Sequence, residues 1–239
     1  ERAQALLDAA SPGRLLDVGC GEGFVLADFA SRGWRVEGMD YSLAGVEAMN
    51  PAMAEHVAQG DVFTLLDRAI EAKQRYDIVW LGNVLEHVLD PLGLLRALRR
   101  LVADGGVLVA TVPNDGSAYQ EALLDSGAID RRFWIALPDH MSYFTADTLR
   151  AAAEAAGWEA AEIMGDFPID FFLAHPGSNY VDSPENGPGA HQARLLLETL
   201  IGASGHGAAN RFYAALADVG LGRNLTAFLK PSNTWEAAP

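Results

Sequence analysis

The stretch that most constrains this fold is a glycine-rich turn near the start of the sequence, residues 15–23. An apolar run enters the turn, Gly19, Gly21 and Gly23 occupy alternate positions in it, and an amphipathic stretch follows it. This order predicts a strand, a tight turn and the start of a helix. Such a turn brings bare backbone close to a ligand, because glycine has no side chain and tolerates left-handed dihedrals. The spacing differs from that of dinucleotide-binding turns, whose last glycine falls here on Phe24, so we expect a site for another nucleotide-like cofactor.

Length and charge limit the partners of the chain. Its 239 residues fit one α/β domain with an inserted or appended subdomain. The formal net charge is -15, whereas nucleic acids and anionic membranes require clustered Lys and Arg. Arg96, Arg99 and Arg100 form a short basic helical face at most. We therefore expect a small-molecule substrate, no nucleic acid and no membrane partner, with a homodimer left open.

The single cysteine, Cys20, excludes an intrachain disulfide and a metal site built from cysteines. We expect it to be a small buried residue rather than a nucleophile. The sequence has no apolar run as long as a membrane span, and the residues at its start lack a signal-peptide pattern. The expected location is the cytoplasm.

Apolar strands alternate with amphipathic helices along the first two thirds of the chain. We expect strands over 14–18, 34–39, 56–59, 76–81, 107–112 and 158–164, and helices over 1–10, 24–30, 43–49, 63–72, 91–102 and 145–156. The alternation predicts a parallel sheet with right-handed crossovers. Ligands bind such sheets at the carboxyl ends of the strands.

Polar residues follow several of these strands and should converge on one crevice. They are Asp40, Asp61, Asn83 and Asn114. A carboxylate in the place of Asp40 can accept two hydrogen bonds from a ribose diol, although it can also cap the next helix. Asp61 can contact the adenine amino group, with Val62 against the base, or cap the helix that follows.

Two segments depart from the alternating pattern. Residues 113–144 form a long polar and aromatic connection, for which we expect a short helix near 119–124 and an active-site role. Residues 176–189 contain six Pro or Gly and predict a mobile loop. Two helices and a final strand over 225–230 should follow. Candidate substrate-pocket residues in this part are Tyr180, His191 and Arg194.

Two histidines are candidates for a general base, since an imidazole accepts protons near neutral pH. His140 is favoured, with Tyr143 orienting it or the substrate, and His87 is the second candidate. Either can instead have a packing role, and His87 can bond a backbone carbonyl. His87, Asp139, His140 and nearby acids could bind a metal ion, but no tight ligand spacing supports one, so none is expected.

These motifs, taken in order, resemble class I S-adenosylmethionine-dependent methyltransferases. The resemblance covers roughly residues 10–165 and the last strand, and residues 76–91 are similar to the branch that includes ubiquinone-biosynthesis O-methyltransferases. It implies a Rossmann-like α/β fold with a seven-stranded, mostly parallel sheet, in which the last strand is antiparallel and inserted beside strand six. It also implies an α/β domain over 1–166, a helical substrate cap over 167–221, and the final strand and tail over 222–239.

The same resemblance implies S-adenosyl-L-methionine as the methyl donor, with S-adenosyl-L-homocysteine as its product. The binding residues carried over from the motifs are Asp17, Gly19, Cys20, Gly21, Asp40, Tyr41, Asp61, Val62, Asn83 and His87.

Residues 138–145, with His140, Tyr143 and Thr145, are similar to a segment of bacterial methyltransferases found with sugar and glycan biosynthesis. This similarity implies O-methylation of a sugar, a glycan precursor or a related metabolite. The alternatives are N- or C-methylation in natural-product biosynthesis, a nicotinamide-dependent oxidoreductase, and a cofactor-binding protein without turnover.

Overall fold

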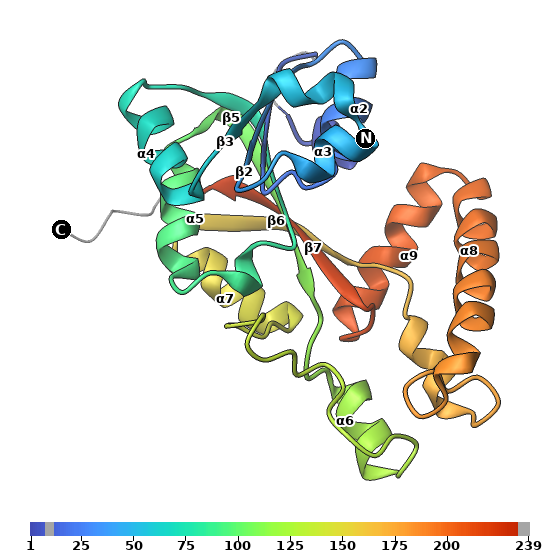
Figure 1. The fold of residues 1–239 in the computed structure, drawn as a ribbon. Helices are drawn as coiled ribbons and strands as arrows, with labels where there is room; N and C mark the ends of the chain where they lie inside the picture. Colours follow the sequence, from blue (N-terminus) through green and yellow to red (C-terminus); the bar gives the residue numbers. More distant parts are fainter. Residues whose placement is uncertain (8–11, 234–239) are drawn as a thin grey trace.

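A computed structural model of the chain describes residues 1–7 and 12–233. A seven-stranded sheet lies between two layers of helices (Figure 1). The strands are β1 (Arg14–Val18), β2 (Arg35–Asp40), β3 (Val57–Gln59), β4 (Tyr76–Gly82), β5 (Val102–Pro113), β6 (Trp158–Gly165) and β7 (Asn224–Pro231).

Nine α-helices and four short 3-10 helices occur in the part of the chain that the structure describes. The α-helices are α1 (Arg2–Ala5), α2 (Phe24–Ser31), α3 (Ala44–Met49), α4 (Val62–Glu71), α5 (Pro91–Arg99), α6 (Ala118–Asp125), α7 (Ala146–Ala155), α8 (Gly187–Ala203) and α9 (His206–Asp218). The 3-10 helices are η1 (Pro51–His56), η2 (Leu85–His87), η3 (Ile169–Ala174) and η4 (Pro184–Asn186).

The order of the strands across the sheet is β3-β2-β1-β4-β5-β7-β6. The first five strands pair in parallel, whereas β7 lies between β5 and β6 and is antiparallel to both. This confirms the predicted sheet and the insertion of the last strand beside the sixth.

Burial on both faces explains why β4 is a continuous apolar run. Ile78, Val79 and Leu81 are fully buried, as is expected for the centre of a parallel sheet. One core cluster contains side chains from α4, α5 and α7, and a second, on the other face, contains side chains from α1 and α2. The two layers hold the carboxyl ends of the strands in fixed positions.

Several element boundaries differ from those predicted. The first helix covers Arg2–Ala5, and residues 8–10 of the predicted helix lie outside the described part. Helix α5 ends at Arg99, and β5 starts at Val102 rather than at 107. Gly105 takes a left-handed φ of 74° there, and the pairing of β4 with β5 shifts its register. Because of this bulge, β5 begins before Gly105 and Gly106. The prediction had placed the start of the strand after these two glycines.

The two segments that interrupt the alternation pack against each other. Leu123, Ile129 and Trp134 of the first form a small apolar cluster with Leu173 and Val181 of the second. The predicted helix near 119–124 is present as α6, and its N-cap is Ser117 in a capping box. The region predicted as a mobile loop contains η4 and the start of α8.

The helices of the C-terminal insertion have different positions. Helix α9 packs on β6, where Leu216 and Ala217 are buried, and is therefore part of a layer of the sheet. Helix α8 stands beside it, away from the sheet (Figure 1). Leu196 and Leu200 of α8 remain largely exposed.

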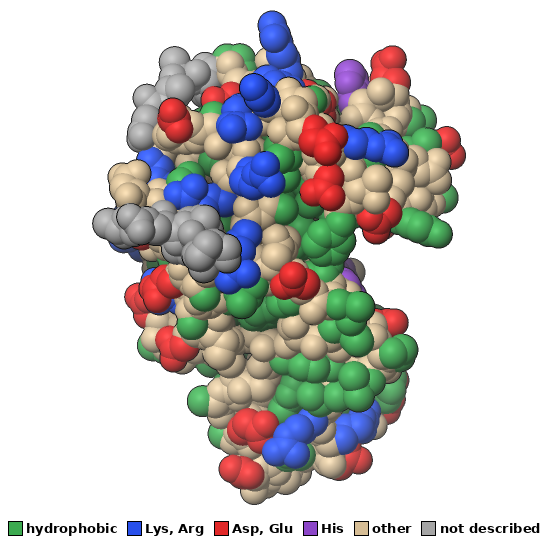
Figure 2. All heavy atoms as spheres, turned by 90° about the vertical axis from the view of Figure 1, so that its left-hand side faces the viewer, with side chains coloured by type: hydrophobic (Ala, Val, Ile, Leu, Met, Phe, Trp, Pro, Cys, Tyr) green, Lys and Arg blue, Asp and Glu red, His purple; other side chains and the backbone are tan. Residues whose placement is uncertain are grey.

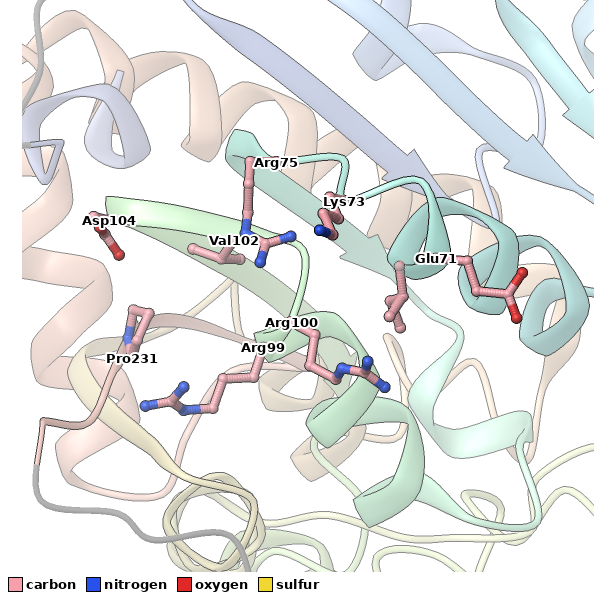
Figure 3. Close-up of a pocket in the computed structure, with 9 residues that line it drawn as sticks. Glu71, Lys73, Arg75, Arg99, Arg100, Val102, Asp104 and Pro231 are labelled. Carbon is pink, nitrogen blue, oxygen red and sulfur yellow. The ribbon is translucent and has the colours of Figure 1, made fainter.

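A surface hollow lies at the end of the sheet where β4 and β5 begin, opposite to the carboxyl ends of these strands. Arg75, Arg100 and Val102 line it at the amino ends of β4 and β5 (Figure 3). Figure 2 shows Lys and Arg side chains gathered on this face. The hollow lies away from the carboxyl ends of the strands and so is separate from the crevice described below. None of the described helices is long and apolar enough to cross a membrane.

Candidate functional site

The glycine turn connects β1 to α2 at the carboxyl edge of the sheet. Gly19, Gly21 and Gly23 all have left-handed φ angles, of 72°, 51° and 75°. A Cβ atom on Gly19 would lie 2.4 Å from Cγ2 of Val84, whereas one on Gly21 would meet nothing within 4 Å. Gly19 therefore packs against the segment after β4, while the backbone at Gly21 faces open space that a ligand can fill.

Asp40, at the end of β2, holds this turn in place. Its Oδ2 accepts a hydrogen bond of 2.8 Å from the amide of Gly21, and its Oδ1 accepts one of 2.9 Å from the amide of Ser42. A carboxylate oxygen has a second lone pair, so both can still accept bonds from a ligand. Tyr41, the next residue, is 80% exposed and is free to cover a bound molecule.

Asp17 lies behind the turn and is 3% exposed. Burial, and then the charge of Asp40, raise the pKa of Asp17 to about 7. The buried thiol of Cys20 has its pKa raised to about 12, by burial first and then by Asp17 and Asp40. The thiol stays protonated near neutral pH, in agreement with a packing role for Cys20 rather than a nucleophilic one.

Asp61 follows β3 and is the N-cap of α4. Its Oδ1 accepts both the amide and the hydroxyl of Thr64, each at 2.9 Å, and these bonds lower the pKa of Asp61. Both bonds use Oδ1, so Oδ2 points to no protein donor in the described residues. The capping role is thus present, and the second oxygen is available for a ligand. Val62, next to it, is half-buried.

The chain turns sharply after β4. Asn83 is exposed and has a left-handed φ of 54°, and its backbone N–H donates to the carbonyl oxygen of Thr111 in β5 at 2.9 Å. Asparagine tolerates this conformation better than most residues. The turn leads directly into η2, which carries Glu86 and His87.

The loop that carries His140 is fixed on η2 by its backbone. The amides of Met141 and Ser142 both donate to the carbonyl oxygen of Glu86, at 2.7 and 3.1 Å. As a result the rings of His87 and His140 lie with their centroids 4.9 Å apart. Both base candidates from the sequence are therefore side by side, at the edge where Val84 meets the glycine turn.

Hydrogen bonding defines the proton positions on one of these imidazoles. Nδ1 of His87 lies 2.7 Å from the carbonyl oxygen of Asp139. A carbonyl oxygen can only accept, so Nδ1 carries a proton and Nε2 of the neutral ring carries the lone pair. His87 is thus fitted to accept a proton at Nε2, and its carbonyl bond was one of the alternatives that the sequence left open.

His140 has a more enclosed environment. Its Nδ1 is buried, has no hydrogen-bond partner and lies 3.6 Å from Oδ2 of the buried Asp115. The hydroxyl of Tyr143 accepts a hydrogen bond of 3.2 Å from the amide of Ala136, and its ring centroid is 6.1 Å from that of His140. Tyr143 therefore contacts His140 through its ring, and its role in orienting His140 or the substrate stays a prediction.

Two buried acids beside these histidines were not predicted as site residues. The side chain of Glu86 is 2% exposed, and burial raises its pKa. Asp115 forms an ion pair of 2.8 Å with Arg223, the residue directly before the last strand, β7. No local spacing links Asp115 to Arg223 or to His140, so the sequence pattern gave no signal for this group.

Three further candidates from the insertion have partners within it. The hydroxyl of Tyr180 donates to Asp170 at 2.7 Å. Arg194 lies 3.3 Å from His191 on the same helix. These contacts tie the three residues to the insertion. Tyr180 also lies close enough to Arg223, the ion-pair partner of Asp115, for the charge of Arg223 to act on its phenol.

Comparisons with known proteins agree with this architecture. A family model described as a methyltransferase domain matches residues 1–163. A ubiquinone biosynthesis O-methyltransferase of Aeromonas salmonicida is 31% identical over 158 residues, which are 64% of this chain and 65% of the relative. One of Ruegeria pomeroyi is 30% identical over 158 residues, 64% of this chain and 62% of the relative. The chain thus spans slightly less than two thirds of the length of these relatives.

Solved structures share the fold. A SAM-dependent methyltransferase from Archaeoglobus fulgidus superposes with a TM-score of 0.60 and 19% identity, over 96% of this chain and 90% of the other. The O-methyltransferase of a trans-AT PKS multienzyme of Brevibacillus brevis was solved with S-adenosyl-L-homocysteine. It superposes with a TM-score of 0.52 and 14% identity, over 93% of this chain and 68% of the other. The family model covers more than half of the sequence, and the sheet has the seven strands and the inserted last strand that the resemblance implied. This chain therefore belongs to the methyltransferase-domain family of class I S-adenosylmethionine-dependent methyltransferases.

Proposed function

We propose that this protein transfers the methyl group of S-adenosyl-L-methionine to a hydroxyl oxygen of a small molecule. The observation that carries the proposal is that the glycine turn packs on the segment leading into the helix that carries His87. Gly19 packs directly against Val84, and η2 with His87 begins at the next residue. The group that accepts a proton thus lies beside the turn expected to hold the methyl donor.

The residues at the carboxyl edge fit this donor. The open backbone at Gly21 suits the amino-acid end, the carboxylate of Asp40 suits the ribose diol, and Oδ2 of Asp61 suits the adenine amino group. Asp17, Cys20, Tyr41, Val62 and Asn83 complete the proposed contacts. When bound, the donor supplies a methyl group already activated on a sulfonium.

The chain's own part in the reaction is to position the acceptor and remove its proton. A hydroxyl oxygen that attacks the methyl carbon loses its proton as the new bond forms, and an imidazole within hydrogen-bond reach can take it. Nε2 of His87 has the lone pair that this step needs. His140 is the second candidate and the one favoured by the sequence. The two segments 113–144 and 167–221 would together exclude water and shape the acceptor pocket.

For the acceptor, we propose a sugar or glycan-precursor hydroxyl, or that of a related metabolite. The support is the similarity of residues 138–145 to methyltransferases found with sugar and glycan biosynthesis. The curated relatives named above are O-methyltransferases of ubiquinone biosynthesis, which makes a phenolic hydroxyl the main rival. Nitrogen and carbon acceptors are the remaining alternatives.

The test is a methyl-transfer assay with labelled S-adenosyl-L-methionine and three acceptor panels: sugars and nucleotide sugars, catechols and other phenols, and amines. We expect product with the first panel, with the methyl group on oxygen by mass spectrometry and NMR. Transfer to phenols alone would replace the sugar proposal. Calorimetry with S-adenosyl-L-homocysteine and with NADH provides the control on the cofactor, and tight binding of NADH alone would contradict the proposed function.

A further inference from the structure

Four cationic side chains line the surface hollow at the amino ends of β4 and β5. They are Lys73, Arg75, Arg99 and Arg100, four of the 17 Lys and Arg residues of the chain. The chain as a whole has a formal net charge of -15, so its overall field repels anions. The proposed methyl transfer takes place at the opposite ends of the strands and gives no reason for this local positive charge.

The pairing of β4 with β5 brings these side chains together. The backbone N–H of Tyr76 donates to the carbonyl oxygen of Leu101 at 2.9 Å, and Tyr76 pairs with Val102 at the bulge. Arg75 and Arg100 precede these paired segments and extend from two different connections into the same region (Figure 3). The cluster therefore comes from the fold of the sheet and not from one helix face.

Acidic side chains do not neutralise the cluster. Within residues 1–7 and 12–233, no ion pair is formed by Lys73, Arg75 or Arg100. The guanidinium of Arg75 donates instead to the uncharged carbonyl oxygen of the preceding residue, at 2.8 Å. Glu71 and Asp104 also line the hollow, but they lie on opposite sides of the cations (Figure 3). Four cations against two acids leave a net positive charge of two.

Lys73 occupies a backbone position that favours glycine. It follows Ala72, the C-cap of α4, and has a left-handed φ of 56°. A left-handed residue at the end of a helix is usually glycine, because a Cβ atom is strained in this conformation. The backbone N–H groups of Lys73 and Gln74 close the last turn of α4, at 3.0 Å each, and need no side chain for it. The lysine side chain therefore costs stability here, as is typical of residues with a function.

The end of α5 does not depend on the cations either. Cations near the C-terminus of a helix can compensate its exposed carbonyl oxygens. The carbonyl oxygens of Ala97 and Leu98 already accept backbone N–H groups, at 3.1 and 2.9 Å. The guanidinium of Arg99 donates to the carbonyl oxygens of Gly157 and Ser232, at 2.7 and 2.6 Å, rather than to α5. These bonds fix Arg99 in the wall of the hollow.

We propose that this hollow binds a small molecule that carries a di- or triphosphate group. Arg and Lys bind phosphate oxygens through charge-assisted hydrogen bonds, which are bidentate in the case of Arg. The volume of the hollow, about 590 Å³, lies within the usual range of small-molecule sites. Its buried lining residues Ile70 and Val102 are apolar and offer a surface to a flat group such as a nucleotide base.

The size of the basic area favours a small ligand over a nucleic acid. A nucleic acid would extend beyond the hollow, and Figure 2 shows Asp and Glu side chains elsewhere on the same face. Their charge would repel the additional phosphates. The hollow is separate from the crevice at the carboxyl ends of the strands, so its ligand is bound in addition to the methyl donor and the acceptor.

The test is isothermal titration calorimetry with UTP, uridine and inorganic tripolyphosphate. Uracil is chosen because the adenine base could enter the site expected for the methyl donor. The variants are Arg75→Gln and Arg100→Gln, which remove one charge each. The control is Arg211→Gln, which removes the charge of an exposed arginine of α9, a helix far from the hollow (Figure 1). Far-UV circular dichroism verifies that every variant is folded.

We expect saturable binding of one UTP per chain, no binding of uridine, and the same UTP affinity in Arg211→Gln. The affinity should fall about 10-fold in Arg75→Gln and in Arg100→Gln, because each loses a charge-assisted hydrogen bond to phosphate. A higher affinity for UTP than for tripolyphosphate would assign the apolar lining to the base, and equal affinities would assign the site to the phosphate chain alone. Absence of saturable binding of both up to about 1 mM, or unchanged affinity in both variants, would overturn the proposal.

Lys73→Gly separates binding from a structural role. Because glycine is unstrained at a φ of 56°, the melting temperature should rise by roughly 2–4 °C. The loss of the cation should at the same time lower the affinity for UTP about 10-fold. Unchanged affinity in this variant would contradict the role of Lys73. The titrations contain neither methyl donor nor acceptor, so their result is independent of the methyl-transfer panels.

Discussion

Replacing Asp17 with Asn should reduce the loss of stability that the protein suffers as the pH rises. Asp17 is 3% exposed, and burial raises its pKa from 3.8 to about 7. The folded chain therefore holds a proton that the unfolded chain releases. This contribution to stability is complete below the unfolded pKa of about 4 and is lost as the pH rises through 7.

The size of the effect follows from the two pKa values. Between pH 5 and pH 8 the titration of Asp17 should remove about 2–3 kcal/mol from the free energy of unfolding. Urea unfolding of the ligand-free protein at several pH values measures it. Asp17→Asn should lose that much less than the wild type, while the exposed Asp67→Asn control should follow the wild type. Parallel curves for the wild type and Asp17→Asn would refute the reasoning.

Three further substitutions test the carboxyl edge. Asp40→Ala removes the charged acceptor of the Gly21 amide, and a hydrogen bond of this kind contributes about 1.5–3 kcal/mol. The affinity for S-adenosyl-L-homocysteine, measured by calorimetry, should fall about 10- to 100-fold. Unchanged affinity would contradict the proposed ribose contact. Gly19→Ala places a Cβ 2.4 Å from Val84 at a φ of 72° and should lower stability by about 1–3 kcal/mol; a thermal melt equal to that of the parent would show that the turn adapts. Asp61→Ala should cost about 1 kcal/mol as a lost helix cap and also weaken ligand binding, and a change in melting alone would leave Asp61 as a cap.

Local patterns were enough to predict the sheet and the turn. Glycine at three alternate positions predicted left-handed backbone at Gly19 and Gly21, because other residues are strained there. The apolar run over 76–81 predicted a strand, and β4 is present there at the centre of the sheet. The helix predicted over 145–156 is present as α7, and its N-cap Thr145 forms a capping box with Thr148. Each of these features depends on neighbours within a few residues.

Features that depend on tertiary contact were not predictable in this way. The predicted boundary between α5 and β5 was wrong because Val102 pairs with Tyr76 across a bulge, and this contact leaves no trace in the hydrophobic periodicity. Glu86 joins His140 only through the backbone bonds of the loop, and Asp115 meets Arg223 only because β7 returns to the sheet. The roles of His87 and His140 stay predictions, although the structure now shows that they are neighbours.

The position of β7 also has a consequence for synthesis of the chain. Strand β6 lies at the edge of the sheet, and β7 is its strand neighbour. While the chain is being made, β1 to β5 can pair as they leave the ribosome, but β6 must wait for residues 224–231 before it gains a partner. Until then β5 also has an open edge, which exposes the unpaired backbone that promotes association between nascent chains. The sheet is therefore completed by almost the last residues described, and so is the ion pair of Arg223 with Asp115 beside the histidine pair.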